Sequence, residues 1–403
     1  MVRVALAGFR WPLDPALAAG RDETTLARTL YPTPLRTDPA TGAVVAGLCS
    51  AWQASPDFRV WRFTCKAAPS IAAGLRRVAR LHDARLNWIF RDARIEAPDG
   101  MSLVVRLPFS WRRFPYVLTA VGAAPRSVPG PFRLESGSAN RVVVRRPGLT
   151  VVFRRLDPVV AVREFRRGNL DEAPVPLGDI VALKARLGNA VRARTLLGVD
   201  LVVFRGFDSE LRRVYWQTAD RGDYEGLVPE FTGSSAFGLV GTGKADPARY
   251  RRALNAIKSL PRVAVRFALP TDRVLRFGAR LLWAEWRDVG LGPQLVARPS
   301  GAFDASLVRL VSAYPQEEAI PAELVLRGDV GARDDLLRAL AVTRQHSWLE
   351  RFDEKVRDSA VVIPVAWVVD ARLVSSRLDG WREDILGDVD YASVRSRAST
   401  RRP

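Results

Sequence analysis

Strand and helix patterns alternate along residues 262–297, and this alternation constrains the fold more than any other feature of the sequence. Residues 262–268 alternate between polar and apolar, as a half-buried strand does. We expect a helix capped by Thr271 and ended by Gly290, and then a second strand at 294–297. The apolar residues of this helix recur at three- and four-residue spacing: Val274, Phe277, Leu281 and Ala284. The segment therefore predicts a βαβ unit with parallel strands.

Other segments extend the same α/β pattern. Residues 200–204, 306–311 and 361–369 are predicted to be buried strands, and Asp246 followed by Pro247 is typical of a helix start. The 403 residues, 48% of them hydrophobic, exceed what one hydrophobic core usually serves, so we expect two or three subdomains. No apolar run reaches the ~20 residues that a membrane-spanning helix needs. The sequence predicts an α/β protein with more than one lobe.

Two short alternating runs surround the turn residues 55–57 and predict a β-hairpin. Trp52 lies in the first run and Trp61 in the second. Cys49 and Cys65 then fall near opposite ends of the two strands, at a cross-strand separation that suits a disulfide. Two free, buried cysteines are the alternative. We predict the disulfide.

The chain is strongly basic, with 62 lysines and arginines against 43 acidic residues and a formal net charge of +19. A nucleic-acid partner is one explanation of such a charge. Only five of the basic residues are lysines, however, and the arginines are scattered among apolar residues, so compositional bias is the simpler explanation. We therefore expect no nucleic-acid partner. The basic segment 394–403 is predicted to be a disordered tail.

Motifs that would indicate catalysis are incomplete. Residues 238–244 have the spacing of a phosphate-binding loop, but Ala245 stands where a magnesium-binding Ser or Thr is needed. His82 and His346, the two histidines, pair with no cysteine nucleophile, and the sequence has no GxSxG motif. Two cysteines and two histidines far apart do not predict a zinc site. We expect no enzyme activity, no cofactor and no metal.

A series of short segments stands out by its motifs and by its order along the chain. The first combines an early Leu-Tyr, an Asp-Pro-x-Thr-Gly turn and a Gly-Leu-x-x-x-Trp entry. Later segments contain a helix end with Gly168 and Asp171, and a helix with Arg212, Asp220 and Arg221. The segments are 30–65, 95–107, 128–134, 162–173, 210–221 and 361–381. In this order they resemble the signature segments of the peptide- and nickel-type solute-binding proteins of ABC importers (solute-binding family 5).

The resemblance extends from about residue 5 to residue 394 and implies a two-lobed, periplasmic-binding-protein-like (type II) fold with a two-strand hinge. The chain would cross to the second lobe around 231–243 and return around 367–372. The parts that the resemblance implies are 1–43, 131–236 and 368–393 for the first lobe, 44–130 for a subdomain inserted in it, and 237–367 for the second lobe.

The resemblance implies a binding function. The lobes would close on a peptide-like or other small solute, which is then delivered to the permease subunits of an ABC transporter in the membrane. We expect a monomer in the periplasm or at the cell surface, with its leader missing from this chain. The alternative is a diverged sensor, or a copy on the same fold that has lost its ligand. The missing leader and the altered loop after Cys65 favour that alternative.

Segment correspondence places six residues at the cleft: Tyr31, Phe204, Arg205, Ala313, Tyr314 and Trp367. Peptide binders of the family have an aspartate in a D-Y-x-D-P segment that pairs with the α-ammonium of the ligand, and Ala313 takes its place here. Arg205 offers a cation that can pair with a ligand carboxylate. The resemblance therefore predicts a neutral or anionic ligand. Glu317 and Glu318 are the nearest acidic residues that could replace the aspartate.

Overall fold

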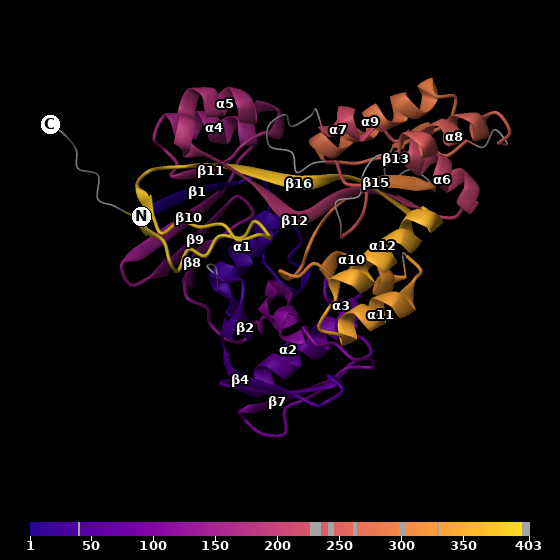
Figure 1. Cartoon of the computed structure of the whole chain (residues 1–403). Helices are drawn as coiled ribbons and strands as arrows, with labels where there is room; N and C mark the ends of the chain where they lie inside the picture. The colour runs from indigo at the N-terminus through magenta and orange to yellow at the C-terminus, as the bar shows by residue number, and fades with distance from the viewer. Residues whose placement is uncertain are drawn as a thin grey trace. The chain divides into compact units, whose positions relative to one another are not determined.

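The chain divides into two units, which are described one at a time. The computed structural model describes residues 1–38, 41–225, 235–240, 246–260, 264–297, 303–328 and 330–396 (Figure 1). Unit 1 consists of Met1–Arg194, Ala313–Gln316 and the chain from Asp370 on. Unit 2 consists of Thr195–Ser312 and Glu317–Val369. The sheets and helices below confirm the expected α/β class.

Two strands carry the chain from one unit to the other: β12 (Val191–Phe204) and β16 (Val362–Val374). We expected the first crossing around 231–243, of which residues 231–234 and 241–243 lie outside the described part of the chain. The division between the two units falls within β12, where Gly198–Phe204 pair with β15 (Ala305–Val311) of unit 2. The lobe boundaries implied by the resemblance stay a prediction.

The main sheet of unit 1 has the strand order β16–β11–β1–β10–β9–β8. Its other strands are β1 (Val2–Leu6), β8 (Arg133–Gly137), β9 (Arg141–Arg146), β10 (Leu149–Arg155) and β11 (Glu172–Pro174). β1 is parallel to β10 and β11, and β8 and β9 continue the sheet antiparallel. The longer helices of the unit outside residues 44–130 are α1 (Arg21–Leu30), α4 (Pro158–Arg166) and α5 (Ile180–Leu187).

A separate antiparallel sheet lies within residues 44–130, in the order β4–β5–β7–β6. The elements are β4 (Cys49–Ala54), β5 (Val60–Cys65), α2 (Ala68–Arg80), α3 (Asn87–Phe90), β6 (Arg94–Glu96) and β7 (Ser102–Arg106). The predicted hairpin is confirmed, since β4 and β5 pair with Trp52 opposite Phe63. Cys49 and Cys65 are disulfide-bonded across the ends of these two strands.

The predicted start of the disordered tail, residue 394, lies too early in the chain. Val394 is fully buried in the core of unit 1, and Arg395–Ser396 form β18, which pairs with β17 (Leu378–Asp379). The prediction is therefore wrong for residues 394–396, because an apolar residue that packs in the core holds the chain there. Residues 397–403 lie outside the described part.

Unit 2 contains strands in the order β14–β13–β15–β12–β16. β13 (Arg266–Leu269) is parallel to β14 (Gln294–Ala297) and to β15, whereas β12 is antiparallel to β15. The helices are α6 (Ser209–Thr218), α7 (Arg221–Glu225), α8 (Pro247–Ile257), α9 (Arg273–Asp288), α10 (Ala319–Arg327), α11 (Arg333–Ala341) and α12 (His346–Ser359). The succession β13–α9–β14 confirms the predicted βαβ unit.

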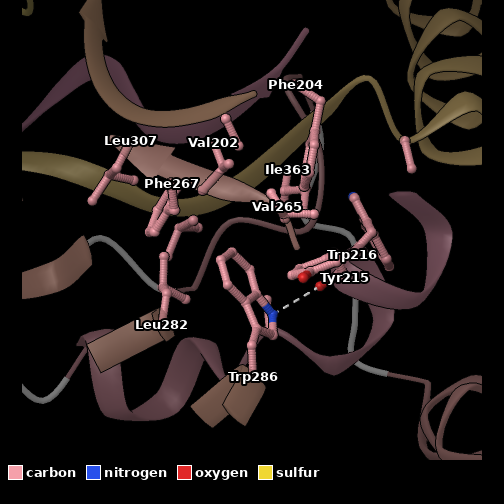
Figure 2. Packing of buried hydrophobic residues seen from close by; sticks show 14 of the residues in the cluster. Val202, Phe204, Tyr215, Trp216, Val265, Phe267, Leu282, Trp286, Leu307 and Ile363 are labelled. Atoms are coloured by element: carbon pink, nitrogen blue, oxygen red, sulfur yellow. Dashed lines mark hydrogen bonds between the residues drawn. The ribbon is translucent and has the colours of Figure 1, made fainter. Parts of the chain in front are cut away.

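The core of unit 2 differs in detail from the predicted helix face. Trp286 of α9 is buried beside Phe267 and donates from its indole Nε1 to the carbonyl of Tyr215 at 3.2 Å (Figure 2). The cap of α9 is Asp272, not Thr271, because its carboxylate accepts from the Leu275 N–H. The predicted stripe through Phe277 is wrong, since that residue is 54% exposed. The buried side chains of α9 are Leu275, Ala279, Leu282 and Trp286.

No helix in the described ranges is both long enough and apolar enough to cross a bilayer.

Candidate functional site

Tyr31 lies immediately after α1, where a close backbone approach holds it. Its half-buried side chain donates a hydrogen bond to the carbonyl of Leu13 at 3.3 Å. Gly130 donates to the carbonyl of Leu30, and a Cβ at residue 130 would lie 2.4 Å from that oxygen and 2.8 Å from the Tyr31 nitrogen. Only glycine permits this approach. The Gly-Pro-Phe turn of the sequence thus fixes the backbone at Tyr31.

Burial and the charges of Arg126 and Asp14 affect the pKa of Tyr31. Burial raises the pKa of its hydroxyl, Arg126 opposes this shift and Asp14 adds to it. Asp14 is bonded by both terminal nitrogens of Arg77 and lies 3.7 Å from Arg126. Burial alone would raise the pKa of Asp14, but the hydrogen bonds from Arg77 and from the Ala16 N–H, together with the charges of Arg77 and Arg126, outweigh it, and the pKa is lowered. This carboxylate is therefore already held by protein cations.

The segment Ala313–Gln316 belongs to unit 1, and its side chains point to different surroundings. Tyr314 is completely buried, with its ring 6.1 Å from that of Trp111. Gln316 accepts a hydrogen bond of 2.7 Å from Arg113. Ala313, which takes the place of the family's aspartate, is partly exposed. The tyrosine thus anchors the segment, while the alanine contributes no charge at its surface.

Phe204 and Arg205 end β12 in unit 2. Phe204 is 4% exposed and packs on Tyr215 with ring centroids 5.6 Å apart. Arg205 is exposed, and its guanidinium carbon lies 4.4 Å above the ring of Phe303. Among the described residues it has no carboxylate partner. Stacking on an aromatic face leaves the edge of a guanidinium available for an anion.

Trp367 lies in the middle of β16 and is partly exposed, although the residues on either side of it are buried. Unit 1 therefore holds three of the six expected residues, namely Tyr31, Ala313 and Tyr314, and unit 2 holds Phe204, Arg205 and Trp367. Within each unit, the contacts above join these residues to other side chains rather than to one another. Their common role in ligand binding stays a prediction.

Glu317 and Glu318 are not two exposed carboxylates on the surface of unit 2. Glu318 is completely buried, and a carboxyl oxygen of Glu317 lies 3.2 Å from His346 Nδ1. His346 also lies 3.3 Å from Glu350, one helical turn further along α12. Both glutamates are therefore engaged within unit 2.

Sequence motifs did not reveal two of the contacts that build this site. Trp111 supports Tyr314, and Phe303 supports Arg205, yet neither aromatic residue stands in a segment with a recognisable motif. Both contacts join residues across turns or long stretches of chain, where local spacing carries no signal. Within the described ranges, no three His, Cys, Asp or Glu side chains are arranged to hold a metal ion.

Arg221, one of the motif residues, has a structural role. It is 4% exposed, and its Nε donates to the carbonyls of Ala236 at 3.0 Å and Pro364 at 2.9 Å. Its Nη1 donates to the carbonyls of Trp216 and Ala219. Burial lowers its pKa to about 9. The arginine thus joins three backbone segments of unit 2: the end of α6, the segment at Ala236 and strand β16.

A buried ionic cluster marks the entry of β16 into unit 1. It consists of two arginines and four carboxyl groups: Arg21, Asp22, Glu172, Asp370, Arg372 and Glu383. Arg21 lies 2.8 Å from Asp370 and 2.5 Å from Glu383. Burial raises the pKa of Asp22 to about 6 and that of Glu383 to about 9; the charge of Asp370 adds to both shifts, and that of Arg21 opposes them. The cluster anchors β16 where the chain returns to unit 1.

Comparisons with known proteins identify the fold of this chain. No family model and no curated protein matches the sequence. Among solved structures, OppA from Haemophilus influenzae in complex with the peptide RPPGFSPFR is 13% identical, with a TM-score of 0.82 over 98% of this chain and 99% of that one. The chain has the fold of these binding proteins. The expectation of a periplasmic-binding-protein-like fold is thereby confirmed.

Two further structures have the same fold. The ABC transporter-associated periplasmic binding protein DppA from Helicobacter pylori, in complex with the peptide STSA, has a TM-score of 0.83 at 13% identity over 98% of each chain. NikZ from Campylobacter jejuni, in complex with Ni(L-His), has a TM-score of 0.75 at 14% identity over 98% of this chain and 97% of that one. OppA, DppA and NikZ thus share one fold and bind ligands of different chemistry, so the ligand of this chain must be argued from its own residues.

Proposed function

We propose that this chain is the substrate-binding component of an ABC importer, which captures a small solute and delivers it to permease subunits in the membrane. The observation that carries the proposal is the similarity of fold over 98% of the chain to DppA, OppA and NikZ, each solved with a bound ligand. These structures were solved as ligand complexes, and the residues of this chain complete no catalytic motif. The proposed role is therefore binding without catalysis.

The proposed ligand is a peptide-like or other small solute that is neutral or anionic. Ala313 brings no carboxylate to pair with a ligand ammonium, and an enclosed ammonium without a counter-charge loses its hydration without compensation. Glu317 is engaged with His346, and Glu318 is completely buried, which argues against either as a substitute. Arg205 is exposed and has no carboxylate partner among the described residues. These features favour a ligand with a carboxylate or with no charge.

The proposed location is outside the cytoplasm, in the periplasm or at the cell surface. Disulfides persist in oxidising compartments and are rare in the cytosol, and Cys49 is bonded to Cys65. DppA, which shares the fold, is described as a periplasmic binding protein. We propose that the chain acts there as a monomer.

Calorimetry with small peptides tests the function and the ligand class together. Di- to pentapeptides with a free N-terminus are compared with the same peptides after N-acetylation. We expect the acetylated peptides to bind at least about tenfold more tightly, because they avoid burying an unpaired ammonium. Tight binding of free peptides that acetylation abolishes would contradict the ligand class. Failure of the folded protein to bind any peptide, sugar or nickel complex would contradict the function and indicate a copy without a ligand.

Arg205→Ala tests the cation directly, and Arg280→Ala is its matched control. Arg280 lies on α9 in the same unit and is also exposed. We expect Arg205→Ala to weaken an anionic ligand by about tenfold, as the loss of a charge-assisted hydrogen bond does. Arg280→Ala should leave the affinity unchanged. Equal effects of the two substitutions would show that Arg205 contributes only to the general positive charge.

A further inference from the structure

Residues from three helices of unit 2 line a cavity, and none of the six residues expected at the cleft is among them. Its volume is about 330 Å³. The lining residues come from α6, α8 and α12 (Figure 1): Arg213, Trp216, Gln217, Arg249, Arg357 and Asp358. We call this cavity the arginine pocket. A volume of this size is at the small end of the range for ligand-binding cavities.

The charges of the arginine pocket are unbalanced. Arg213 donates from Nε to the backbone carbonyl of Asp358, which leaves its positive charge without a counter-charge. Arg249 lies 3.3 Å from Asp246, the N-cap residue of α8. Arg357 has no carboxylate partner within the described ranges. Asp358 is the one carboxylate in the lining, so Arg213 and Arg357 together face a single negative charge, whereas Arg249 is paired with Asp246.

Two N–H donors of the lining are also unsatisfied. The indole Nε1 of Trp216 and the Nε of Arg357 are buried, and neither has a hydrogen-bond partner in the described part of the chain. Trp216 is 7% exposed, and the guanidinium of Arg357 lies 6.0 Å above its ring. Buried donors are usually paired in a folded protein. Trp216 and Arg357, which both line the arginine pocket, thus each have a buried N–H donor that the described residues leave without an acceptor.

A further guanidinium group next to Trp216 adds to the positive potential. The guanidinium of Arg221 lies 4.6 Å from the ring of Trp216, and its Nη2 likewise has no hydrogen-bond partner among the described residues. Its remaining nitrogens donate to neutral backbone carbonyls, so that its charge is not neutralised by contact. Trp216, which lines the arginine pocket, is thus in contact with a fourth cation, the buried Arg221.

We propose that the arginine pocket binds a small molecule that carries a phosphate group. A phosphate offers several acceptor oxygens and up to two negative charges, which suits the arrangement of several guanidinium groups around one cavity. The volume exceeds that of a single phosphate ion, so the pocket accommodates a further group of the same molecule. None of the residues expected to bind the transported solute lines this pocket, and the inference does not depend on the proposed function.

Calorimetry of the full chain at fixed ionic strength tests the proposal with three probes: inorganic phosphate, inorganic pyrophosphate and citrate. We expect saturable binding at one site, with pyrophosphate tighter than phosphate. Binding of citrate alone would overturn the phosphate assignment. Absence of binding of all three anions by the folded protein would overturn the site. Raising the salt concentration should weaken pyrophosphate binding, because exposed charges are screened.

Four substitutions locate the binding. Arg213→Gln and Arg249→Gln each remove one charge from the lining and should weaken pyrophosphate by about tenfold, whereas Arg280→Gln on α9 should have no effect. Asp358→Asn removes the one carboxylate of the lining and keeps the carbonyl that Arg213 contacts. It should tighten binding several-fold. A gain of affinity cannot arise from misfolding. Equal weakening by all three arginine substitutions, or no gain in Asp358→Asn, would overturn the assignment to this pocket.

Discussion

Tyr314 packs its ring edge-on against Trp111, with the two ring centroids 6.1 Å apart and an interplanar angle of 62°. Both side chains are completely buried in unit 1. Trp111 continues the contact into an aromatic cluster with Trp88, Phe109 and Phe114. Tyr314 therefore holds the segment Ala313–Gln316, in which Ala313 takes the place of the aspartate found in peptide binders of the family. The backbone at Ala313 depends on this packing.

Tyr314→Ala should lower the free energy of unfolding by about 3–5 kcal/mol, as the loss of a buried aromatic ring does. Urea unfolding measures the loss, and Tyr250→Ala is the control, since Tyr250 is 40% exposed and should cost less than about 1 kcal/mol. A double-mutant cycle with Trp111→Leu should give a coupling of about 0.5–1.5 kcal/mol between the two rings. Additive losses would show that the rings do not interact.

The Cys49–Cys65 disulfide closes a loop over a sequence separation of 16 residues. Removing the cross-link by Cys49→Ala with Cys65→Ala should lower the free energy of unfolding by about 3 kcal/mol, because the unfolded chain gains freedom. The untreated protein should show no free thiol on titration, and a reducing agent should lower its Tm while leaving that of the double variant unchanged. Two thiols in the untreated protein would contradict the pairing.

Glu285 makes stability depend on pH. Burial, together with Asp220 and Asp223, raises the pKa of its carboxyl to about 7, against a weaker opposing effect of Arg221. The folded state then holds a proton that the unfolded state has lost, so the contribution of Glu285 to stability falls as the pH rises from about 4.5 to about 7. Glu285→Gln should remove this dependence and be more stable than the parent protein at pH 8.

Unfolding of both proteins at several pH values between 4 and 8 measures the difference. The control is Glu354→Gln, which changes an exposed glutamate of α12. It should leave the pH profile of stability as it is. If the difference between Glu285→Gln and the parent protein stays constant from pH 4 to pH 8, the carboxyl does not titrate in this window.

Arg221 should be essential for the fold of unit 2. It donates to four backbone carbonyls while almost fully buried, so Arg221→Met leaves four acceptors without their donors. We expect a loss of about 3–5 kcal/mol in the free energy of unfolding. Arg221→Lys should recover only part of it, because one ammonium cannot reach carbonyls that a guanidinium fork spans. Full recovery by lysine would show that the charge, not the geometry, matters.

Local sequence patterns predicted the positions of helices and strands along the chain better than the face that each helix buries. The β13–α9–β14 unit follows from spacing and caps, but α9 has two apolar stripes of similar spacing. In the stripe through Phe277, that residue is exposed and the others are partly exposed, whereas the stripe through Trp286 is buried. A tertiary contact decides between them, since a Cβ at Gly278 would lie 2.2 Å from the ring of Tyr224. No local pattern contains that information.

The ionic cluster at the return of β16 was not predictable for a similar reason. Arg21 pairs with Asp370 and Glu383, which lie at the other end of the chain. In a sequence with 62 basic and 43 acidic residues, any arginine has many candidate partners. Charge patterns predict helix-surface pairs a few residues apart. They carry no signal for pairs that only the fold brings together.

Gly130→Ala tests the close approach that fixes Tyr31. An added Cβ would lie 2.4 Å from the carbonyl oxygen of Leu30, so the backbone of the turn or the end of α1 must shift. Overpacking of this kind costs about 1–3 kcal/mol. Gly178→Ala is the control, because its Cβ would meet no atom within 4 Å. Urea unfolding should show a loss for the first variant and little or none for the second.

The same pair of variants connects the turn to ligand binding. If Tyr31 contacts the solute, as the resemblance implies, Gly130→Ala should weaken binding by about tenfold or more, since small displacements of a positioning group lower affinity strongly. Tyr31→Phe should weaken binding less, because it keeps the ring in place and removes only the bond to the Leu13 carbonyl. Calorimetry with the best solute checks both. Unchanged affinity in Gly130→Ala together with a loss of stability would assign the glycine to the fold and remove Tyr31 from the binding site.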